Sequence, residues 1–360
     1  MTSIEENLCK LISFRTDGNK DEIAKLVSYM VDILEMNDLV YEVIKNDDGK
    51  ENIVALIGGS DFKNLKDAIL LSGHLDVVRG EDKLFNPIFD KGYVVGRGAV
   101  DMKSFIAIVL SSIKELKEIG KPIVLAITSD EETKVLGVKK ILEFFRENSI
   151  NFKSGIVGEP TNLAVGIANK GYVSGKICVK GKAVHSSINK QGVNVVEIIN
   201  KLWSKIFELN DKYYDKGCRL NIGKIKCDND VNVVADKGSF EFEIRYEESI
   251  QKDEIINVIL YEIERLKIDY KNSKIECNWD IEIPVFEENK ESILAKKMLN
   301  NKNMKSKKLD YVTEAGFYQS YGIDVVVFGA GVDELCHTDD EKILVNDCLD
   351  YKNKLLEILV

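Results

Sequence analysis

The chain has 360 residues, 44% of them hydrophobic and 31% charged, which is typical of a soluble globular protein long enough for two domains. Its net charge of −10, without a cluster of Lys and Arg, argues against a nucleic-acid-binding surface. No segment approaches the ~20 apolar residues of a membrane helix, and the acidic N-terminus is unlike a signal peptide. Seven scattered cysteines without a C-x-x-C pair favour a reducing compartment, so we expect a cytoplasmic protein without nucleic-acid or membrane partners.

The first half of the chain alternates predicted helices with short apolar strands. Three of these strands are wholly apolar, as in strands that are buried on both faces of a mixed or parallel sheet. Each is followed at once by polar residues, with the sequences GHLD, SDEE and GEP. Because ligands bind at the carboxyl ends of strands in open α/β sheets, we expect a site at this edge. The expected helices are 3–15, 19–36, 101–118 and 135–147, and the expected strands are 39–44, 52–57, 68–72, 122–128 and 155–157.

From about Lys170 the pattern changes to strands of alternating hydrophobicity. We interpret the order of the elements as β-α-β-β-α-β, which predicts a ferredoxin-like α+β layer. After Pro284 the α/β pattern returns, so we predict an α/β domain at 1–168 and 284–360 with an inserted domain at 169–283. The expected elements are strands 173–179, 218–226, 231–235, 239–246, 273–282 and 324–328 and helices 193–209, 251–267, 289–300 and 346–359.

The segment from Gly96 to Lys103, GRGAVDMK, places Asp101 between a glycine-rich bend and a predicted helix. An Asp at the start of a helix is most often a cap. Its carboxylate also carries about four lone-pair sites on two oxygens, so it can bind two metal ions. The remaining polar residues at the strand ends favour this second interpretation.

These residues form one set of two imidazoles and three carboxylates, which suits zinc and, less selectively, cobalt or manganese. One His and one terminal carboxylate for each ion, with a shared Asp101, leave a position open for catalysis. Asp76 can accept the second ring N–H of the neighbouring histidine and fix its tautomer. Glu131 is the neighbour of the candidate ligand Glu132 in the sequence, but by strand-end geometry its side chain points in a different direction. We therefore interpret Glu131 as the general base. The predicted ligands are His74, Asp101, Glu132, Glu159 and His337.

The motifs GHLDVV, GRGAVDMK, TSDEET, GEPT and KGKAVHSS, with the late His337, occur in an order that resembles one known family. This is the family of zinc aminoacylases, acetylornithine deacetylases and succinyl-diaminopimelate desuccinylases, and the resemblance covers nearly the whole chain. It implies a zinc-exopeptidase-like three-layer catalytic domain with an inserted ferredoxin-like lid and dimerisation domain, and a homodimer. It also implies a cis peptide bond after Asp101, as in relatives.

The resemblance implies that one Zn²⁺ ion is bound by His74, Asp101 and Glu159 and a second by Asp101, Glu132 and His337. By the ligand chemistry above, Co²⁺ or Mn²⁺ can substitute. In relatives the histidine that matches His185 polarises the scissile carbonyl in the partner's active site, whereas the sequence alone favours a surface role in a Ser-rich turn. Residues that match substrate-binding positions or motifs of relatives are Asn232, Arg245, Thr313 and Gly316. On a strand, Arg245 can equally form a surface ion pair.

GEPT, the segment from His185 to Asn194, and TEAG at 313–316 are most similar to the acetylornithine deacetylases. We therefore expect removal of acetyl from N²-acetylornithine, in arginine biosynthesis, by attack of metal-bound hydroxide. The loop Gly329-Ala-Gly331 lacks the Pro of many relatives, which leaves three alternatives open: desuccinylation of succinyl-diaminopimelate, deacylation of another N-acyl amino acid, and dipeptide cleavage. A non-catalytic metal-binding protein is a different class, and an intact Glu131 argues against it. An oxidoreductase lacks its nucleotide fingerprint.

Overall fold

The computed structural model describes residues 3–287, 289–300 and 304–360. They form two compact units. The larger unit comprises Met1–Ala168, Phe286–Leu309 and Thr313–Val360, and the smaller unit comprises Asn169–Val285 and Asp310–Val312.

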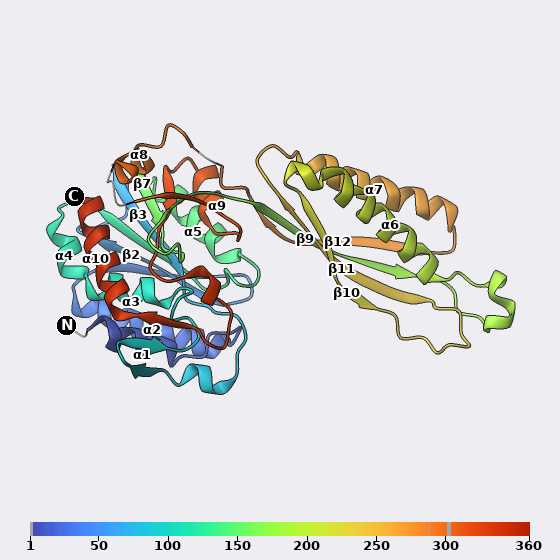
Figure 1. Ribbon diagram of the computed structural model, residues 1–360, viewed down its shortest axis with the longest axis horizontal. Helices are drawn as coiled ribbons and strands as arrows, with labels where there is room; N and C mark the ends of the chain where they lie inside the picture. The colour runs from blue at the N-terminus through green and yellow to red at the C-terminus, as the bar shows by residue number, and fades with distance from the viewer. Residues whose placement is uncertain (1–2, 288, 301–303) are drawn as a thin grey trace. The chain divides into compact units, whose positions relative to one another are not determined.

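The larger unit is built on a mixed sheet, which contains eight strands in the described part of the chain, in the order β1-β2-β6-β3-β7-β14-β8-β13. The central strands β6, β3, β7 and β14 are parallel, so their carboxyl ends lie at one edge of the sheet. Figure 1 labels β3 and β7 among them. β3 and β6 are buried at every residue, which explains their unbroken apolar sequences. The bounds are β1 Val40–Lys45, β2 Glu51–Ile57, β3 Ala68–His74, β6 Ile123–Thr128, β7 Phe152–Val157, β8 Val165–Asn169, β13 Ser306–Leu309 and β14 Val325–Val327.

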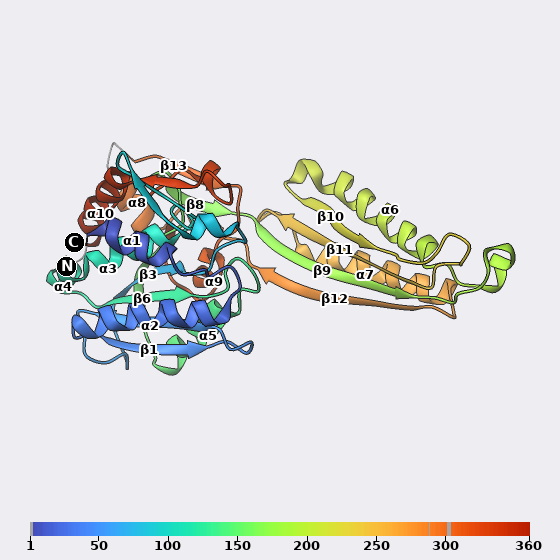
Figure 2. The ribbon, with the colours of Figure 1, turned by 90° about the horizontal axis from the view of Figure 1, so that it is seen from below.

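Helices cover both faces of this sheet and complete three layers. One face packs against α1 (Ile4–Ile12), α2 (Lys20–Met36), α3 (Lys103–Ser111) and α10 (Val345–Leu359) in one continuous apolar core. Figure 2 shows α1, α3 and α10 grouped on this side. The other face packs against α5 (Leu136–Glu147) and α9 (Ala315–Ser320), and α8 spans Ile293–Leu299.

The sequence analysis predicted one continuous helix at 101–118, and this is wrong. The segment forms two helices, α3 and α4 (Ile113–Glu118), which are separated at Ser112. The Ser112 hydroxyl donates a 2.7 Å hydrogen bond to the Ile108 carbonyl, four residues earlier. A side-chain bond of this kind competes with the backbone ladder and bends helices.

A small sheet that the sequence analysis did not predict lies in the same unit. Three strands pair antiparallel in the order β15-β5-β4, with bounds β4 Ile88–Asp90, β5 Tyr93–Val95 and β15 Lys342–Leu344. The pairing of β5 with β15 brings the loop that begins at Gly96 next to the segment that ends at Glu341, with a 3.0 Å bond from the Gly96 N–H to the Glu341 carbonyl.

The smaller unit has the element order β9-α6-β10-β11-α7-β12, and its antiparallel sheet has the order β10-β11-β9-β12. Helices α6 and α7 cover one face over a second apolar core. This is the ferredoxin-like arrangement, so the predicted fold class is confirmed. The strand predicted at 231–235 is wrong, because these residues form a loop with one isolated bridge from Val233 to His185. The bounds are β9 Gly171–Lys180, α6 Val195–Tyr213, β10 Arg219–Lys226, β11 Lys237–Tyr246, α7 Lys252–Asp269 and β12 Lys274–Ile283.

None of the helices in the described residues is long and apolar enough to span a membrane.

Candidate metal centre

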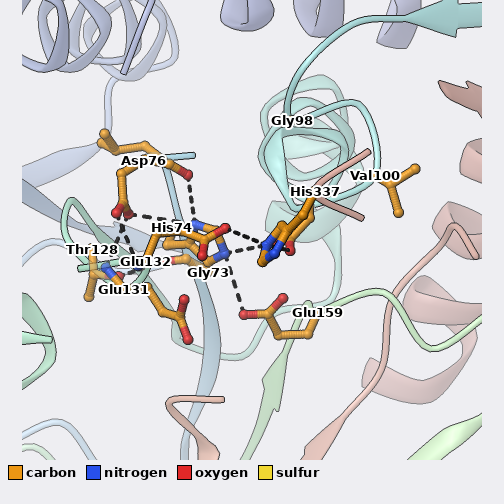
Figure 3. A network of polar contacts seen from close by, with 12 residues as sticks. Gly73, His74, Asp76, Gly98, Val100, Thr128, Glu131, Glu132, Glu159 and His337 are labelled. Carbon is orange, nitrogen blue, oxygen red and sulfur yellow. Dashed lines mark hydrogen bonds and ion pairs between the residues drawn. The ribbon is translucent and has the colours of Figure 1, made fainter. Parts of the chain in front are cut away.

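The ends of the parallel strands deliver most of the candidate ligands to one place. His74 is the last residue of β3, while Glu132 and Glu159 lie just beyond β6 and β7. Asp101 lies two residues before α3, and His337 lies in the loop between β14 and β15. Figure 3 shows the rings of His74 and His337 close together, with Glu132 and Glu159 beside them.

Asp101 lies between the two histidines. Its Oδ1 is 3.0 Å from His74 Nε2, and its Oδ2 is 3.2 Å from His337 Nε2. The outer carboxylates complete the pattern, since Glu159 Oε1 is 3.5 Å from His74 Nε2 and Glu132 Oε1 is 2.9 Å from His337 Nε2. The Asp101–Met102 peptide bond is cis, as the resemblance implied.

These separations fit the donor set of a two-metal site. Ligand atoms that lie 2.0–2.2 Å from one tetrahedral zinc ion are about 3.4 Å from each other, close to the distances found here. Among the residues that the structure describes, two groups of three could hold an ion, each with its ligand atoms within 4.8 Å of one another. One group is His74, Asp101 and Glu132, and the other is His74, Glu131 and Glu159. Distance alone therefore leaves Glu131 within reach of an ion, and its role needs a chemical test.

Asp76 contacts the second ring nitrogen of His74, as expected, but through its backbone carbonyl and not through its carboxylate. The backbone carbonyl of Asp76, at 2.9 Å, is the hydrogen-bond partner of His74 Nδ1, while its carboxylate lies 3.6 Å away. That carboxylate instead accepts 3.1 Å hydrogen bonds from the backbone N–H groups of Glu131 and Glu132. The carbonyl keeps the proton on Nδ1 and so directs Nε2 of His74 toward Asp101. The carboxylate orients the loop that carries both glutamates.

Burial and mutual repulsion shift the pKa values of these acids. Burial, with Glu132 and Asp130 nearby, raises the pKa of Asp76 to about 7, against the opposing effect of His74. Burial and the adjacent Asp101 raise the pKa of Glu159 to about 7, and burial also raises the pKa of Glu131. Hydrogen bonds with Asp101 and Glu132 raise the pKa of His337 to about 10. Several carboxylates that are buried close together in a low-dielectric pocket are stabilised by cations, which a metal centre would provide.

Two further residues of this centre, Arg97 and Glu341, were missed by the sequence analysis. Both are buried, and Arg97 Nη1 donates a 2.7 Å hydrogen bond to Glu341 Oε2. The other oxygen, Oε1, accepts hydrogen bonds from the backbone of the Asp101 loop. Arg97 belongs to the GRGAVDMK motif, but Glu341 follows in a run of acidic residues that reads as solvent-exposed.

Thr313 and Gly316, predicted to contact substrate, are buried around the start of α9. The Thr313 hydroxyl accepts a 3.1 Å bond from the Ala315 N–H, so it supports the helix start. The neighbouring Glu314 is almost wholly buried, and burial strongly raises its pKa. These contacts give Thr313 a structural role in this conformation.

The remaining predicted residues belong to the smaller unit. His185 is exposed, and its Nδ1 lies 2.8 Å from Ser187 Oγ. Asn232 is brought next to it, because the Ser186 N–H donates to the Asn232 carbonyl at 2.9 Å. Arg245 pairs with Glu243 at 3.1 Å and lies over the Tyr172 ring, which is the ion-pair alternative.

Comparison with known proteins finds a matching family. The model of peptidase family M20/M25/M40 matches residues 70–359. An acetylornithine deacetylase of Buchnera aphidicola subsp. Schizaphis graminum is 30% identical over 96% of this chain and 92% of its own length.

Solved structures share the fold. A tripeptidase of Staphylococcus aureus has a TM-score of 0.78 at 20% identity, covering 99% of this chain and 96% of its own. A dinuclear metal-binding peptidase of Bacillus subtilis has a TM-score of 0.62 at 14% identity, covering 98% of both chains.

Proposed function

The chain belongs to peptidase family M20/M25/M40, and from this premise we propose that it is a dinuclear zinc amidohydrolase that removes the acetyl group from N²-acetylornithine. The observation that carries the proposal is the position of Asp101, which presents one carboxylate oxygen to His74 and the other to His337. A carboxylate shared in this way is the usual bridge of a two-metal hydrolase, whose ions lie ~3.5–4 Å apart.

We assign His74, Asp101 and Glu159 to one ion and Asp101, Glu132 and His337 to the other. When bound, the two ions polarise the amide carbonyl and lower the pKa of water at the site. Zinc suits this mixture of imidazole and carboxylate ligands, and cobalt or manganese can substitute. The backbone carbonyl of Asp76 holds the tautomer of His74 that these roles require.

Glu131 is the proposed general base. Its backbone is held by the Asp76 carboxylate, and its own carboxylate lies among the ligand atoms of His74 and Glu159. Burial raises its pKa, which makes this carboxylate a better proton acceptor. Glu131 takes the proton from the attacking water and passes it to the leaving α-amine of ornithine.

Support for the substrate comes from the relatives and from the chain's own motifs. The similarity to an acetylornithine deacetylase extends over nearly the whole of both chains. GEPT at 158–161 and TEAG at 313–316 agree with that assignment. The product, ornithine, places the reaction in arginine biosynthesis, and unpaired cysteines at all seven positions suit a cytoplasmic enzyme.

We further propose a homodimer in which the smaller unit serves as lid and dimer interface. His185 and Asn232 then contact the substrate bound to the partner, with His185 stabilising the oxyanion. Their adjacent loops support a common role, since the Ser186 N–H binds the Asn232 carbonyl. For Arg245, a role in binding the substrate's α-carboxylate requires that it exchange Glu243 for the ligand.

A substrate panel with zinc-loaded protein tests the proposal. Acetylornithine, succinyl-diaminopimelate, acetylmethionine and two dipeptides are compared by kcat/KM, with the chelator-treated protein as control. We expect acetylornithine to exceed the others by at least about 10-fold, which corresponds to ~1.4 kcal/mol of transition-state discrimination. A preference for the succinyl substrate or for dipeptides would reassign the substrate within the family, and no zinc-dependent hydrolysis of any amide would reject the function.

A further inference from the structure

Two candidate ligands of the second ion come from segments far apart in the chain. Asp101 precedes α3, whereas His337 precedes β15. The exposed side-chain fraction of His337 is 51%, so packing alone does not hold its ring against Asp101. Its backbone also lies in the left-handed region, at φ 64°, which residues other than glycine adopt only where neighbouring contacts enforce it.

A buried ion pair joins these two segments. Glu341 Oε1 accepts the backbone N–H groups of Gly98 (3.0 Å), Val100 (2.9 Å) and Asp101 (3.1 Å). Glu341 thereby fixes the backbone that presents Asp101. Its second oxygen, Oε2, receives Arg97 Nη1 at 2.7 Å.

Arg97 continues the connection to the histidine. The same Nη1 donates to the Thr338 carbonyl at 3.0 Å, and Nη2 lies 3.5 Å from the His337 carbonyl. A guanidinium can make these contacts together because its donors form a rigid planar fork. The exposed fractions of the Arg97 and Glu341 side chains are only 3% and 1%, so water does not compete for these bonds.

We propose that Arg97 and Glu341 act as a clamp that positions Asp101 and His337 and so sets the affinity for the second metal ion. This inference rests on the proposed dinuclear centre. Neither residue is among the proposed metal ligands, and both bind the backbone of the segments that carry those ligands, so both are positioning residues. The first ion shares Asp101 with the second, so it depends on the clamp in part. It depends on the clamp less than the second ion does, because His74 ends a buried strand and its Nδ1 is held by the Asp76 carbonyl.

Two variants separate the parts of the clamp. Arg97→Lys keeps a positive charge beside Glu341 but removes the fork that reaches the two carbonyls. Glu341→Gln keeps Oε1 as an acceptor for the loop but turns an amide N–H toward Arg97. The matched control is Glu115→Gln, which removes a 2.7 Å ion pair with Lys352 elsewhere in the larger unit. Circular dichroism of each metal-free protein verifies its fold, and Arg97→Lys keeps the test decisive if Glu341→Gln does not fold.

The experiment titrates metal-free protein with Zn²⁺ against a chromophoric chelator and repeats the titration with Co²⁺, whose absorption spectrum reports coordination. We expect the wild type and Glu115→Gln to bind two ions. Both clamp variants should bind the first ion within about threefold of wild type and the second about 10–100-fold more weakly, as for other residues that support metal ligands. Wild-type affinity for both ions in the folded variants, or equal loss of both, would overturn the clamp and leave the proposed function intact. A wild type that binds fewer than two ions would overturn both.

Discussion

Glu132 Oε1 lies 2.9 Å from His337 Nε2, although 205 residues separate them in the sequence. Glu132 follows the buried strand β6, whereas His337 lies in a loop that the small sheet of β4, β5 and β15 holds in place. The contact therefore depends on the larger unit as a whole. One ligand of the second proposed ion lies in the turn that follows a strand of the central sheet, and the other lies in a distant loop.

Replacing Asp76 should weaken metal binding without unfolding the protein. Its carboxylate accepts the N–H groups of Glu131 and Glu132, so Asp76→Asn turns part of that acceptor into a donor. We expect a loss of about 10–100-fold in zinc affinity, measured by competition with a chelator.

The control for this prediction is Asp130→Asn. Asp130 is also a buried carboxylate that accepts two backbone N–H groups, those of Leu136 and Gly137 at the start of α5. Its loss should lower the thermal midpoint and leave zinc affinity close to wild type. Equal effects of both variants on zinc affinity would contradict a specific role of Asp76.

Zinc binding should release protons and strengthen as the pH rises from 6 to 8. The raised pKa of His337, about 10, means that the metal-free protein holds a proton on this ring at pH 7. With a pKa of about 7, Glu159 is about half protonated there. Zinc needs the neutral imidazole and the carboxylate, so it must displace these protons. Calorimetry in two buffers of different ionisation enthalpy measures the release, and a pH-independent affinity without proton release would contradict it.

The proposed crossing of His185 into the partner's site predicts complementation. His185→Ala and Glu131→Gln should each be nearly inactive as homodimers. In a randomly mixed population, half of the dimers are hybrids, and each hybrid has one site with an intact Glu131 and an intact partner histidine. Co-refolding should therefore restore about a quarter of wild-type activity. If both variants are inactive alone and the mixture also stays inactive, His185 acts within its own subunit. An active His185→Ala homodimer would show that His185 has no role in the reaction.

The parts of the fold that were predictable are those in which burial dictates composition. The apolar runs at 68–72 and 122–128 are strands because both faces of the central sheet are covered, and their ends deliver His74 and Glu132 as expected. Helices such as α2 follow from their apolar stripe, and its start at Lys20 follows from the Asn19 cap.

The small sheet could not be predicted in this way. Strands β4, β5 and β15 have three residues each, too few to show a periodicity, and β15 pairs with β5 across most of the chain. The role of Glu341 depends on that pairing, so its burial is invisible in the acidic run that contains it. The loop at 231–235 was mistaken for a strand because four of its five residues are apolar, although Val231 is fully exposed.

The roles of Glu131 and Glu132 are the central claim, since these neighbours are assigned different chemistry. Glu132 contacts His337 as a ligand would, whereas Glu131 is proposed only to carry a proton. Glu131→Gln keeps the shape and leaves all five proposed ligands in place. Loss of a general base typically costs about 10²–10⁴ in rate.

The most direct test measures zinc content and kcat on the same preparations of Glu131→Gln and Glu132→Gln. The account predicts two zinc ions per chain and a kcat at least about 100-fold lower for Glu131→Gln. It predicts loss of about one ion together with activity for Glu132→Gln. A Glu131→Gln protein that loses zinc, or that keeps most of its turnover, would contradict the assignment of the base.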